Sequence, residues 1–553
     1  MSGDSSVRVP VDIRRLPWVR RLAADYAYDF RQLAPFYAGD PSDHASWAAA
    51  IARMQARGAE RSQIASVIAA QQRRRQAPAR ALEAGEQLAN PRTVAIVTGQ
   101  QAGLFGGPLF TLLKALTALK LADQVSHDHQ VPVVAVFWID AEDHDWNEVR
   151  SCTVFDDTLA PRTVSLPPDG AADGAPVAAV RLTDAVVAAL DDLERVLPAT
   201  EFRPSLVAAL RHAYAPGTGM AAAFGCWLEA VLGDRGLVVF DSSDPVAKPL
   251  ASGIFVRELS MPGRTTSLAR AAGADLVACG YHAQVQTAAD GPALFRLVGH
   301  DLERINGRRR AIQQQDGHFL IDGAHHEPAR LVDEAGHRPE GFSPNVLLRP
   351  LVQDTLFPTI CYVAGPSELA YLGQLRDVYA HFGVSMPLMY PRASATLLDS
   401  AGLRFLTKYG LPIEAIGRQD DAALNELVAK QIPPEIEASL ADAGRAIDAG
   451  MARAIEMMPS LDPTLEGAAR TTLGRMQHDL QTLHGKMIQA AKKRNETLKR
   501  QFVRVQALAF PGGHAQERAI GFVSFLNQYG PALVERLEDE LPLDIGQHWI
   551  VTV

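Results

Sequence analysis

Six titratable side chains crowd into nine residues of this sequence, directly after a long apolar run. The six are Asp140, Glu142, Asp143, His144, Asp145 and Glu148. Carboxylates at this density suit a general base, a Mg²⁺ site or an ammonium-binding site, and an imidazole beside them suits a proton shuttle. Trp138 and Trp146 flank the cluster, which favours partial burial over a solvated loop. We therefore predict catalytic roles for His144, Asp145 and Asp143.

A second polar cluster, Gly99-Gln100-Gln101, follows another apolar run and opens a glycine-rich turn that ends at Gly107-Pro108. The turn lacks both the G-K-[ST] of a P-loop and the G-x-G-x-x-G of a dinucleotide fingerprint. Backbone amides at the following helix start suit a carboxylate or phosphate, but a tight turn with close helix–sheet packing needs the same glycines. Glutamines donate and accept hydrogen bonds, as a polyhydroxyl or amino-acid ligand requires. The residues leave a ligand site and a plain turn as open alternatives.

Further charged candidates occur later in the chain. Glu368 lies in the first turn of a helix that Pro366 begins, where a carboxylate complements the helix dipole. Arg392 follows an apolar run at Tyr390-Pro391-Arg392, and its planar fork matches a carboxylate or phosphate. Arg308–Arg310, in contrast, fits the charged edge of an exposed hairpin better than a phosphate site.

The elements that must position these side chains are short apolar runs. Val94–Val97 is one, and Val133–Ile139 is too continuously apolar for a half-exposed strand and fits one buried on both faces. Pro108 to Ala122 has helical periodicity, which completes a strand–helix–strand unit with parallel strands. Ligands of such α/β sheets bind beyond the carboxyl ends of the strands, where both polar clusters fall. We expect one crevice lined by Gln100, Gln101, His144, Asp145 and Glu368.

The chain of 553 residues is long enough for two or three domains. Its net charge of −9 and pI near 6.0 argue against a nucleic-acid partner. Four widely spaced cysteines indicate free thiols in a reducing compartment, not a disulfide framework or zinc site. No apolar run has the length of a signal-peptide core or a membrane span, so we expect a cytoplasmic protein without a membrane partner.

Seven segments describe the expected organisation. They are N-terminal helices with the first half of the core (1–150), a helical connecting segment (151–235), a core strand (236–254), an inserted β-containing segment (255–340), the second half of the core (341–420), an antiparallel helical coiled coil (421–510) and a C-terminal segment packed on the core (511–553).

Apolar residues from Leu473 to Ala490 step by three and four, as in a coiled-coil seam, and predict a dimer. If the chain is a monomer, the same seam pairs with residues 436–455 of its own chain. The seam loses its register near Arg494, where we place a phosphate contact.

Four stretches carry a wider signal: TGQQAGLFGGPLFTLLKALTALKLA (98–122), FWIDAEDHDWNEV (137–149), PNVLLRPLVQDTLFPTICYVAGPSELAYLGQL (344–375) and MPLMYPRASATLL (386–398). They resemble the cysteine ligase family of bacillithiol biosynthesis. The resemblance implies an α/β fold: a Rossmann-like, doubly wound parallel sheet core with inserted connecting segments and a C-terminal α-helical coiled-coil domain, in a homodimer. It also favours a ligand site over a plain turn. We therefore expect substrate contacts at Gly99, Gln100, Gln101, Gly107 and Glu368, and nucleotide contacts at Tyr390, Pro391, Arg392 and Arg494.

The activity implied by the resemblance is a ligase that adds L-cysteine to glucosaminyl-malate, the last step in making the low-molecular-weight thiol bacillithiol. Amide formation in water is uphill, so ATP is the expected energy source, and the resemblance also implies ATP/ADP as the nucleotide. Activation as an adenylate or as an acyl phosphate is left open, and so is Mg²⁺. A rival hypothesis is a nucleotide-binding dimeric scaffold without turnover, since the sequence lacks Walker, ATP-grasp and synthetase signatures. A third and weaker one is a metal hydrolase built on Glu142–Asp145, although we assign no residue as a metal ligand.

Overall fold

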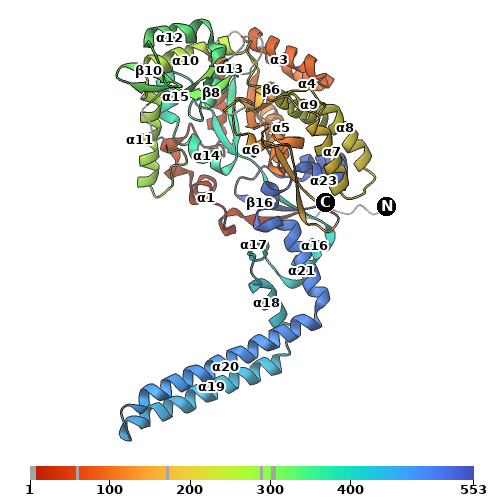
Figure 1. Ribbon diagram of the computed structural model, residues 1–553, viewed down its shortest axis with the longest axis vertical. Helices are drawn as coiled ribbons and strands as arrows, with labels where there is room; N and C mark the ends of the chain where they lie inside the picture. Colours follow the sequence, from red (N-terminus) through yellow and green to blue (C-terminus); the bar gives the residue numbers. More distant parts are fainter. Residues whose placement is uncertain (1–7, 58–60, 170–173, 287–290, 300–306) are drawn as a thin grey trace. The chain divides into compact units, whose positions relative to one another are not determined.

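The structure is a computed structural model that describes residues 8–57, 61–169, 174–286, 291–299 and 307–553 (Figure 1). It divides the chain into two compact units. The first joins residues 1–397 to residues 516–553, and the second spans residues 398–515. The last segment of the chain is therefore part of the first unit.

A five-stranded parallel sheet forms the centre of the first unit (Figure 1). Its strand order is β14 (Leu388–Pro391), β13 (Thr359–Ala364), β2 (Val94–Gln100), β3 (Val133–Ile139) and β6 (Val238–Asp241). Every neighbouring pair is parallel, and the order runs outward from β2 in both directions. All of β13 and all but the last residue of β2 are buried, as strands covered on both faces require. The predicted doubly wound α/β core is confirmed.

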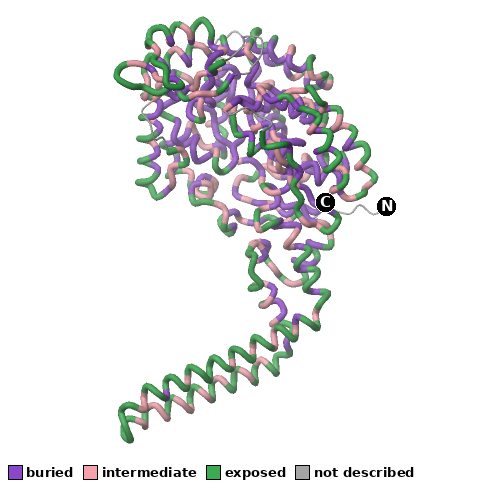
Figure 2. Tube along the Cα trace, viewed as in Figure 1, coloured by how far each residue is buried: buried purple, intermediate pink, exposed green. Residues whose placement is uncertain are grey.

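Helices from distant parts of the sequence cover this sheet. α5 (Leu109–His129) packs against β2, β3 and β13, while α2 (His44–Ala56) packs against β13, β14 and β2. Ala95 and Val97 of β2 join a core with Tyr26, and the intervening Ile96 is fully buried on the other side of the sheet. Figure 2 shows buried chain concentrated in this part of the first unit. The remaining covering helices are α1 (Arg21–Tyr28), α3 (Ser62–Arg75), α4 (Ala79–Gln87), α13 (Arg349–Leu356), α14 (Pro366–Leu372) and α15 (Arg376–Phe382).

The two connecting segments differ from expectation in one respect. Residues 151–235 begin with an unpredicted β-hairpin, β4 (Ser151–Phe155) and β5 (Pro161–Ser165), before the expected helices α7 (Ala185–Val196), α8 (Arg203–Ala213) and α9 (Met220–Leu232). The β-containing insertion holds two small antiparallel sheets. One contains β7 (Leu294–Val298), β8 (Arg308–Ala311) and β12 (Phe342–Pro344), and the other β9 (Gln313–Gln315), β10 (His318–Ile321) and β11 (Ala324–His326). The helices of this segment are α10 (Ser252–Ser260), α11 (Arg264–Ala278) and α12 (Pro328–His337).

Both ends of the chain enter one further sheet, in which β16 (Gln547–Thr552) lies between β1 (Arg8–Asp12) and β15 (Ser394–Leu398). Three short helices precede β16: α22 (Gln516–Ala519), α23 (Phe522–Tyr529) and α24 (Ala532–Glu540). All three contact α5, so the C-terminal segment covers the helix that follows β2.

The second unit contains an antiparallel pair of long helices, α19 (Pro434–Met457) and α20 (Leu465–Arg494). Hydrogen bonds join Gln477 to Asp448 at 2.9 Å and His484 to Glu437 at 3.1 Å. The predicted seam on α20 is divided into two rows. Leu473, Leu480 and Met487 are half-buried, whereas Met476, Leu483 and Ala490 are exposed. The other helices of this unit are α16 (Ser400–Tyr409), α17 (Ile413–Ile416), α18 (Ala422–Ala429) and α21 (Glu496–Ala509).

Candidate active site

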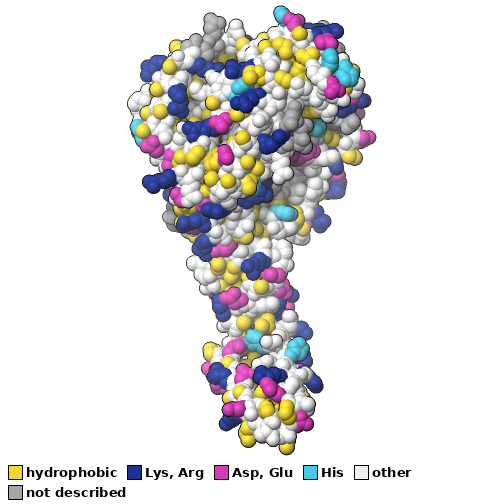
Figure 3. Space-filling view, turned by 90° about the vertical axis from the view of Figure 1, so that its left-hand side faces the viewer, with side chains coloured by type: hydrophobic (Ala, Val, Ile, Leu, Met, Phe, Trp, Pro, Cys, Tyr) yellow, Lys and Arg dark blue, Asp and Glu magenta, His cyan; other side chains and the backbone are white. Residues whose placement is uncertain are grey.

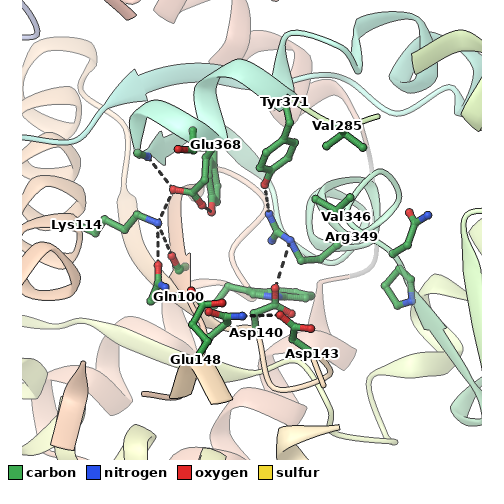
Figure 4. Close-up of a pocket in the computed structure, with 18 of the residues that line it drawn as sticks. Gln100, Lys114, Asp140, Asp143, Glu148, Val285, Val346, Arg349, Glu368 and Tyr371 are labelled. Atoms are coloured by element: carbon green, nitrogen blue, oxygen red, sulfur yellow. Dashed lines mark hydrogen bonds and ion pairs between the residues drawn. The ribbon is translucent and has the colours of Figure 1, made fainter. Parts of the chain in front are cut away.

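A cavity of about 640 Å³ lies beyond the carboxyl ends of β2, β3 and β13 (Figure 4). This is the sheet edge at which the sequence predicted a crevice. Gln100, Gln101, Asp143 and Glu368 line it, and so does Gly99. His144 and Asp145 do not line it, so the structure brings together only part of the predicted set.

A buried ion pair joins two strand-to-helix turns at one side of this cavity. Lys114 of α5 contacts the Glu368 carboxylate of α14 directly, and Lys114 Nζ donates to Gly99 O at 2.8 Å (Figure 4). Glu368 also accepts from the Tyr362 hydroxyl and from the Gly365 amide, each at 2.7 Å. Burial alone would raise the pKa of Glu368, but the Lys114 charge and these hydrogen bonds hold it below its usual range. Lys114, which the sequence left unassigned, therefore fixes Glu368 in its charged form.

Asp140 projects into the cavity opposite Arg349 of α13 (Figure 4). Arg349 Nε lies 3.8 Å from Asp140 Oδ2, and Arg349 Nη2 donates to the Tyr371 hydroxyl at 2.9 Å. Burial raises the pKa of Asp140 to about 6, although the Arg349 charge opposes the shift. A carboxylate whose pKa lies near the working pH has the property that a general base needs.

Asp143 is held in its charged form by its neighbours. Gln101 Nε2 donates to Asp143 Oδ2 at 2.5 Å, and the His144 amide donates to Oδ1 at 2.7 Å. Arg309 Nη1 lies 3.6 Å from the same Oδ1. Burial alone would raise the pKa of Asp143, but these partners lower it below its usual range. Such a carboxylate is a poor proton acceptor, and its contacts suit it to orienting Gln101 and Arg309.

Of the other members of the acidic cluster only Glu148 lines the cavity. His144 Nδ1 lies 3.3 Å from Arg309 Nη1 and 3.4 Å from Asp143 Oδ1, outside the lining. The His144 side chain is 49% exposed, and Asp145 caps α6 (Trp146–Val149) by accepting from the Glu148 amide at 3.1 Å. Glu142 turns away from the cavity and forms a buried ion pair with Lys248. Within the described residues no group of three or more His, Cys, Asp or Glu side chains is arranged to hold a metal ion.

The helix start at Pro108 offers less to an anion than its sequence suggested. Gly107 adopts a left-handed φ of 75°, and its carbonyl accepts from the Phe522 amide at 3.2 Å. The Leu109 amide donates to Ile520 O at 2.8 Å. The C-terminal segment thus uses hydrogen-bonding groups that we had expected a ligand to use, and Gly107 lines a smaller adjoining cavity instead.

Arg392, which we predicted to bind phosphate, is paired instead with a carboxylate of the same unit. Arg392 Nη1 and Nη2 donate to the two Glu517 carboxylate oxygens at 2.9 and 2.6 Å, and both side chains are almost fully buried. Tyr390 donates its hydroxyl proton to Leu543 O at 3.0 Å, while Pro391 lines a neighbouring cavity of about 250 Å³. Arg494 is exposed at the end of α20 in the second unit. Arg392 therefore does not present the free fork that we expected for a nucleotide phosphate.

The interpretation of Arg308–Arg310 as an exposed hairpin edge was wrong for its middle residue. The Arg309 side chain is only 8% exposed, lines the cavity and lies over the Phe295 ring at 4.0 Å. Successive side chains of a strand point to opposite faces, which places Arg309 on the face opposite Arg308 and Arg310, but three consecutive arginines give no sequence signal for which of them turns inward. Arg349 carried no local signal, because its partners Asp140 and Tyr371 come from other segments.

Fold and site together define an α/β protein with a doubly wound core and a charged crevice for a small polar ligand. Family models identify it further: "Bacillithiol biosynthesis BshC, N-terminal Rossmann-like domain" matches residues 10–393, and "Bacillithiol biosynthesis BshC, C-terminal coiled-coil domain" matches residues 395–553. The chain belongs to the BshC family of bacillithiol biosynthesis.

Relatives align along most of the chain. Proteins named "Putative cysteine ligase BshC" include one from Salinibacter ruber, 33% identical over 96% of each chain. Those from Symbiobacterium thermophilum and Koribacter versatilis are 32% and 31% identical, over 95% and 96% of this chain and 96% and 97% of the relatives. The resemblance found in the sequence, and the Rossmann-like core with a coiled-coil domain, are confirmed. In the described part of the chain every helix is too short or too polar to span a bilayer.

The Lys114–Glu368 pair gives a prediction for stability. Glu368→Gln should lower the free energy of unfolding by about 3–5 kcal/mol, because the Lys114 charge stays buried without its partner. Lys114→Met should cost less, because Glu368 is only half-buried and keeps its hydrogen bonds from Tyr362 and Gly365. The double variant should cost less than the sum of the two. Tryptophan fluorescence during urea unfolding measures this, since all six tryptophans lie in the first unit.

The control is Arg195→Ala, which breaks an exposed ion pair with Asp192 and should cost about 1 kcal/mol or less. Strict additivity of the Lys114 and Glu368 substitutions would contradict a direct interaction between them.

Proposed function

We propose that this protein is a ligase that joins L-cysteine to glucosaminyl-malate through an amide bond, at the expense of ATP. The observation that carries the proposal is the Asp140–Arg349 pair, which puts a proton acceptor and a fixed positive charge in one crevice. The names of the relatives support the reaction class. ATP is proposed on energetic grounds, because condensing a carboxylate with an amine in water is uphill.

The other walls of the cavity suit an acceptor with hydroxyl and carboxylate groups. Gln100 and Asn345 offer amides, and Tyr371 offers a hydroxyl, so sugar hydroxyls find both donors and acceptors. Arg309 and Arg349 supply planar donors that match the carboxylates of a malyl group. When Arg309 and Arg349 bind the carboxylates of the acceptor, they compensate less of the negative charge on Asp143 and Asp140. This change favours proton uptake at Asp140.

The reaction needs the acceptor amine as a free base. Its nitrogen forms the C–N bond at the cysteine carbonyl carbon once ATP has activated the carboxyl group. The C–O bond to the phosphate or adenylate leaving group breaks, and the proton that the nitrogen loses passes to Asp140 Oδ. Arg349 keeps the carboxylate oriented through its 3.8 Å contact and is itself fixed by Tyr371 and by Gln353 Oε1 at 3.2 Å. Arg392 is occupied by Glu517 and the Tyr390 hydroxyl by Leu543 O, so neither is assigned to ATP, whereas the exposed Arg494 stays a proposed phosphate contact.

The direct test combines purified protein with L-cysteine, glucosaminyl-malate and ATP and follows the thiol product by mass spectrometry. Product should form only with all three substrates, and serine in place of cysteine should lower the yield. Nucleotide binding without product under any substrate combination would contradict the ligase and favour the dimeric scaffold.

A second test is the pH dependence of kcat/KM. Because the basic form of Asp140 is required and its pKa is about 6, kcat/KM should gain an additional fall of about tenfold per pH unit below 6. Asp140→Asn should lower kcat by about 10²–10⁴-fold and abolish this limb of the profile. His144→Ala, at the exposed rim, is the matched comparison. If His144→Ala abolishes turnover and Asp140→Asn does not, the proton belongs to the imidazole.

We also propose that the protein is a homodimer through α19 and α20. A two-helix hairpin buries only one row of the α20 seam, and Met476 and Leu483 remain 40% and 48% exposed. Figure 3 shows apolar atoms among charges of both signs on this hairpin. A second copy would cover the open row.

Replacing Met476 and Leu483 together by Glu should therefore convert a dimer to a monomer in light scattering coupled to size exclusion, with the helix content unchanged. Thr482→Glu, an exposed neighbour outside the seam, is the control. A wild-type chain that is monomeric at micromolar concentration would contradict the dimer.

A further inference from the structure

Seven of the nine charged side chains that line the main cavity have a partner of opposite charge. The pairs are Lys114 with Glu368, Asp140 with Arg349, Asp143 with Arg309, and Arg392 with Glu517. Glu148 and Arg518 remain. Neither side chain has a hydrogen bond or ion pair with any residue of the described chain, and both are exposed. One negative and one positive charge at the same cavity are therefore left for a ligand.

These two side chains also line a second cavity of about 330 Å³ that adjoins the first. Gln100, Gln101 and Phe110 are shared between the two cavities as well, so the cavities meet along this wall. Figure 4 shows Glu148 on the same side of the main cavity as Gln100. A ligand held between Glu148 and Arg518 would lie where the two spaces join.

Arg518 is oriented without being neutralised. Its guanidinium lies 6.0 Å from the centre of the Phe110 ring, which the Arg392 guanidinium approaches at 5.5 Å. Arg392 is neutralised by Glu517, the residue that precedes Arg518 on α22. Arg518 is thus the cation of the second cavity that no described carboxylate pairs with, and Glu148 is the carboxylate that lines the same cavity.

The remaining walls of the second cavity carry small side chains, some apolar and two polar, Ser151 and Thr153. Val149, Cys152, Ala519 and Gly521 contribute to them, and the Cys152 thiol is buried. Such walls suit a short side chain such as –CH₂–SH and exclude a long or charged one. The size of the space and the two free charges fit a small zwitterion better than a nucleotide or a sugar.

We propose that Glu148 and Arg518 form the amino-acid subsite of this enzyme, with Glu148 binding the ammonium group and Arg518 the carboxylate of L-cysteine. The side chain of the amino acid points toward Val149 and Cys152, and the carboxyl group faces the main cavity that holds the acceptor. This assignment rests on the proposed ligase function and adds to it the residues that select the amino-acid substrate.

The test measures, by calorimetry, the binding of three thiols to the whole chain and to two variants of it. The variants are Arg518→Met and Glu148→Gln, and the thiols are L-cysteine, cysteamine, which lacks the carboxylate, and N-acetylcysteine, which lacks the ammonium group. Each variant should weaken L-cysteine binding by about tenfold or more, because each removes one charge-assisted contact. Arg518→Met should leave cysteamine binding unchanged, and Glu148→Gln should leave N-acetylcysteine binding unchanged.

Arg53→Met and Glu83→Gln, exposed residues that line neither cavity, are the controls and should bind all three thiols as the wild type does. In the complete reaction, the KM for cysteine should rise in both site variants while the KM for the acceptor stays within a few-fold. If the wild type binds and ligates cysteine and both variants do so equally well, the subsite is wrong and the ligase stands. If the wild type neither binds nor ligates cysteine, both proposals are overturned.

Discussion

The buried contact between Lys114 and Glu368 is the interaction on which the crevice depends. Lys114 comes from the helix after β2 and Glu368 from the helix after β13, so one ion pair joins two β–α turns of the sheet. The same two side chains bond the carbonyl of Gly99 and the amide of Gly365, where the strands end. The pair thus bridges the two turns that bound this side of the cavity.

Charge compensation sets the electrostatic character of the crevice. Three pairs, Lys114–Glu368, Asp140–Arg349 and Asp143–Arg309, fix their members by mutual contact and leave the centre of the cavity nearly neutral. A neutral, hydrogen-bonding space suits an aminosugar, whereas a strongly positive one would suit a polyphosphate. The pKa of Asp140 is raised because its burial prevails, whereas the pKa of Asp143, three residues away, is lowered because Asp143 accepts hydrogen bonds from His144 and Gln101 and lies near Arg309. Two neighbouring carboxylates thereby acquire opposite tendencies toward protons.

The sequence predicted the parts of the fold and site that depend on local pattern. The buried runs Val94–Val97 and Val133–Ile139 identified parallel strands, and the topology of such a sheet placed Gln100, Gln101 and Glu368 at one edge. The sequence did not predict which side chains pair with each other when they lie far apart along the chain. Glu517, 125 residues away in the sequence, forms an ion pair with the Arg392 guanidinium. Nothing in the sequence Tyr390-Pro391-Arg392 predicts this partner. Within the acidic cluster, residues only two positions apart have different roles. Asp143 lines the cavity, whereas Asp145 caps a short helix.

The central claim is that amide formation takes place in the crevice at the carboxyl ends of β2, β3 and β13. It is tested most directly by a crystal structure of the Asp140→Asn variant with L-cysteine and glucosaminyl-malate bound. The account predicts acceptor density between Gln100 and Arg349, with its amine within hydrogen-bonding distance of residue 140. Acceptor density outside this cavity, with the crevice filled only by solvent, would contradict it.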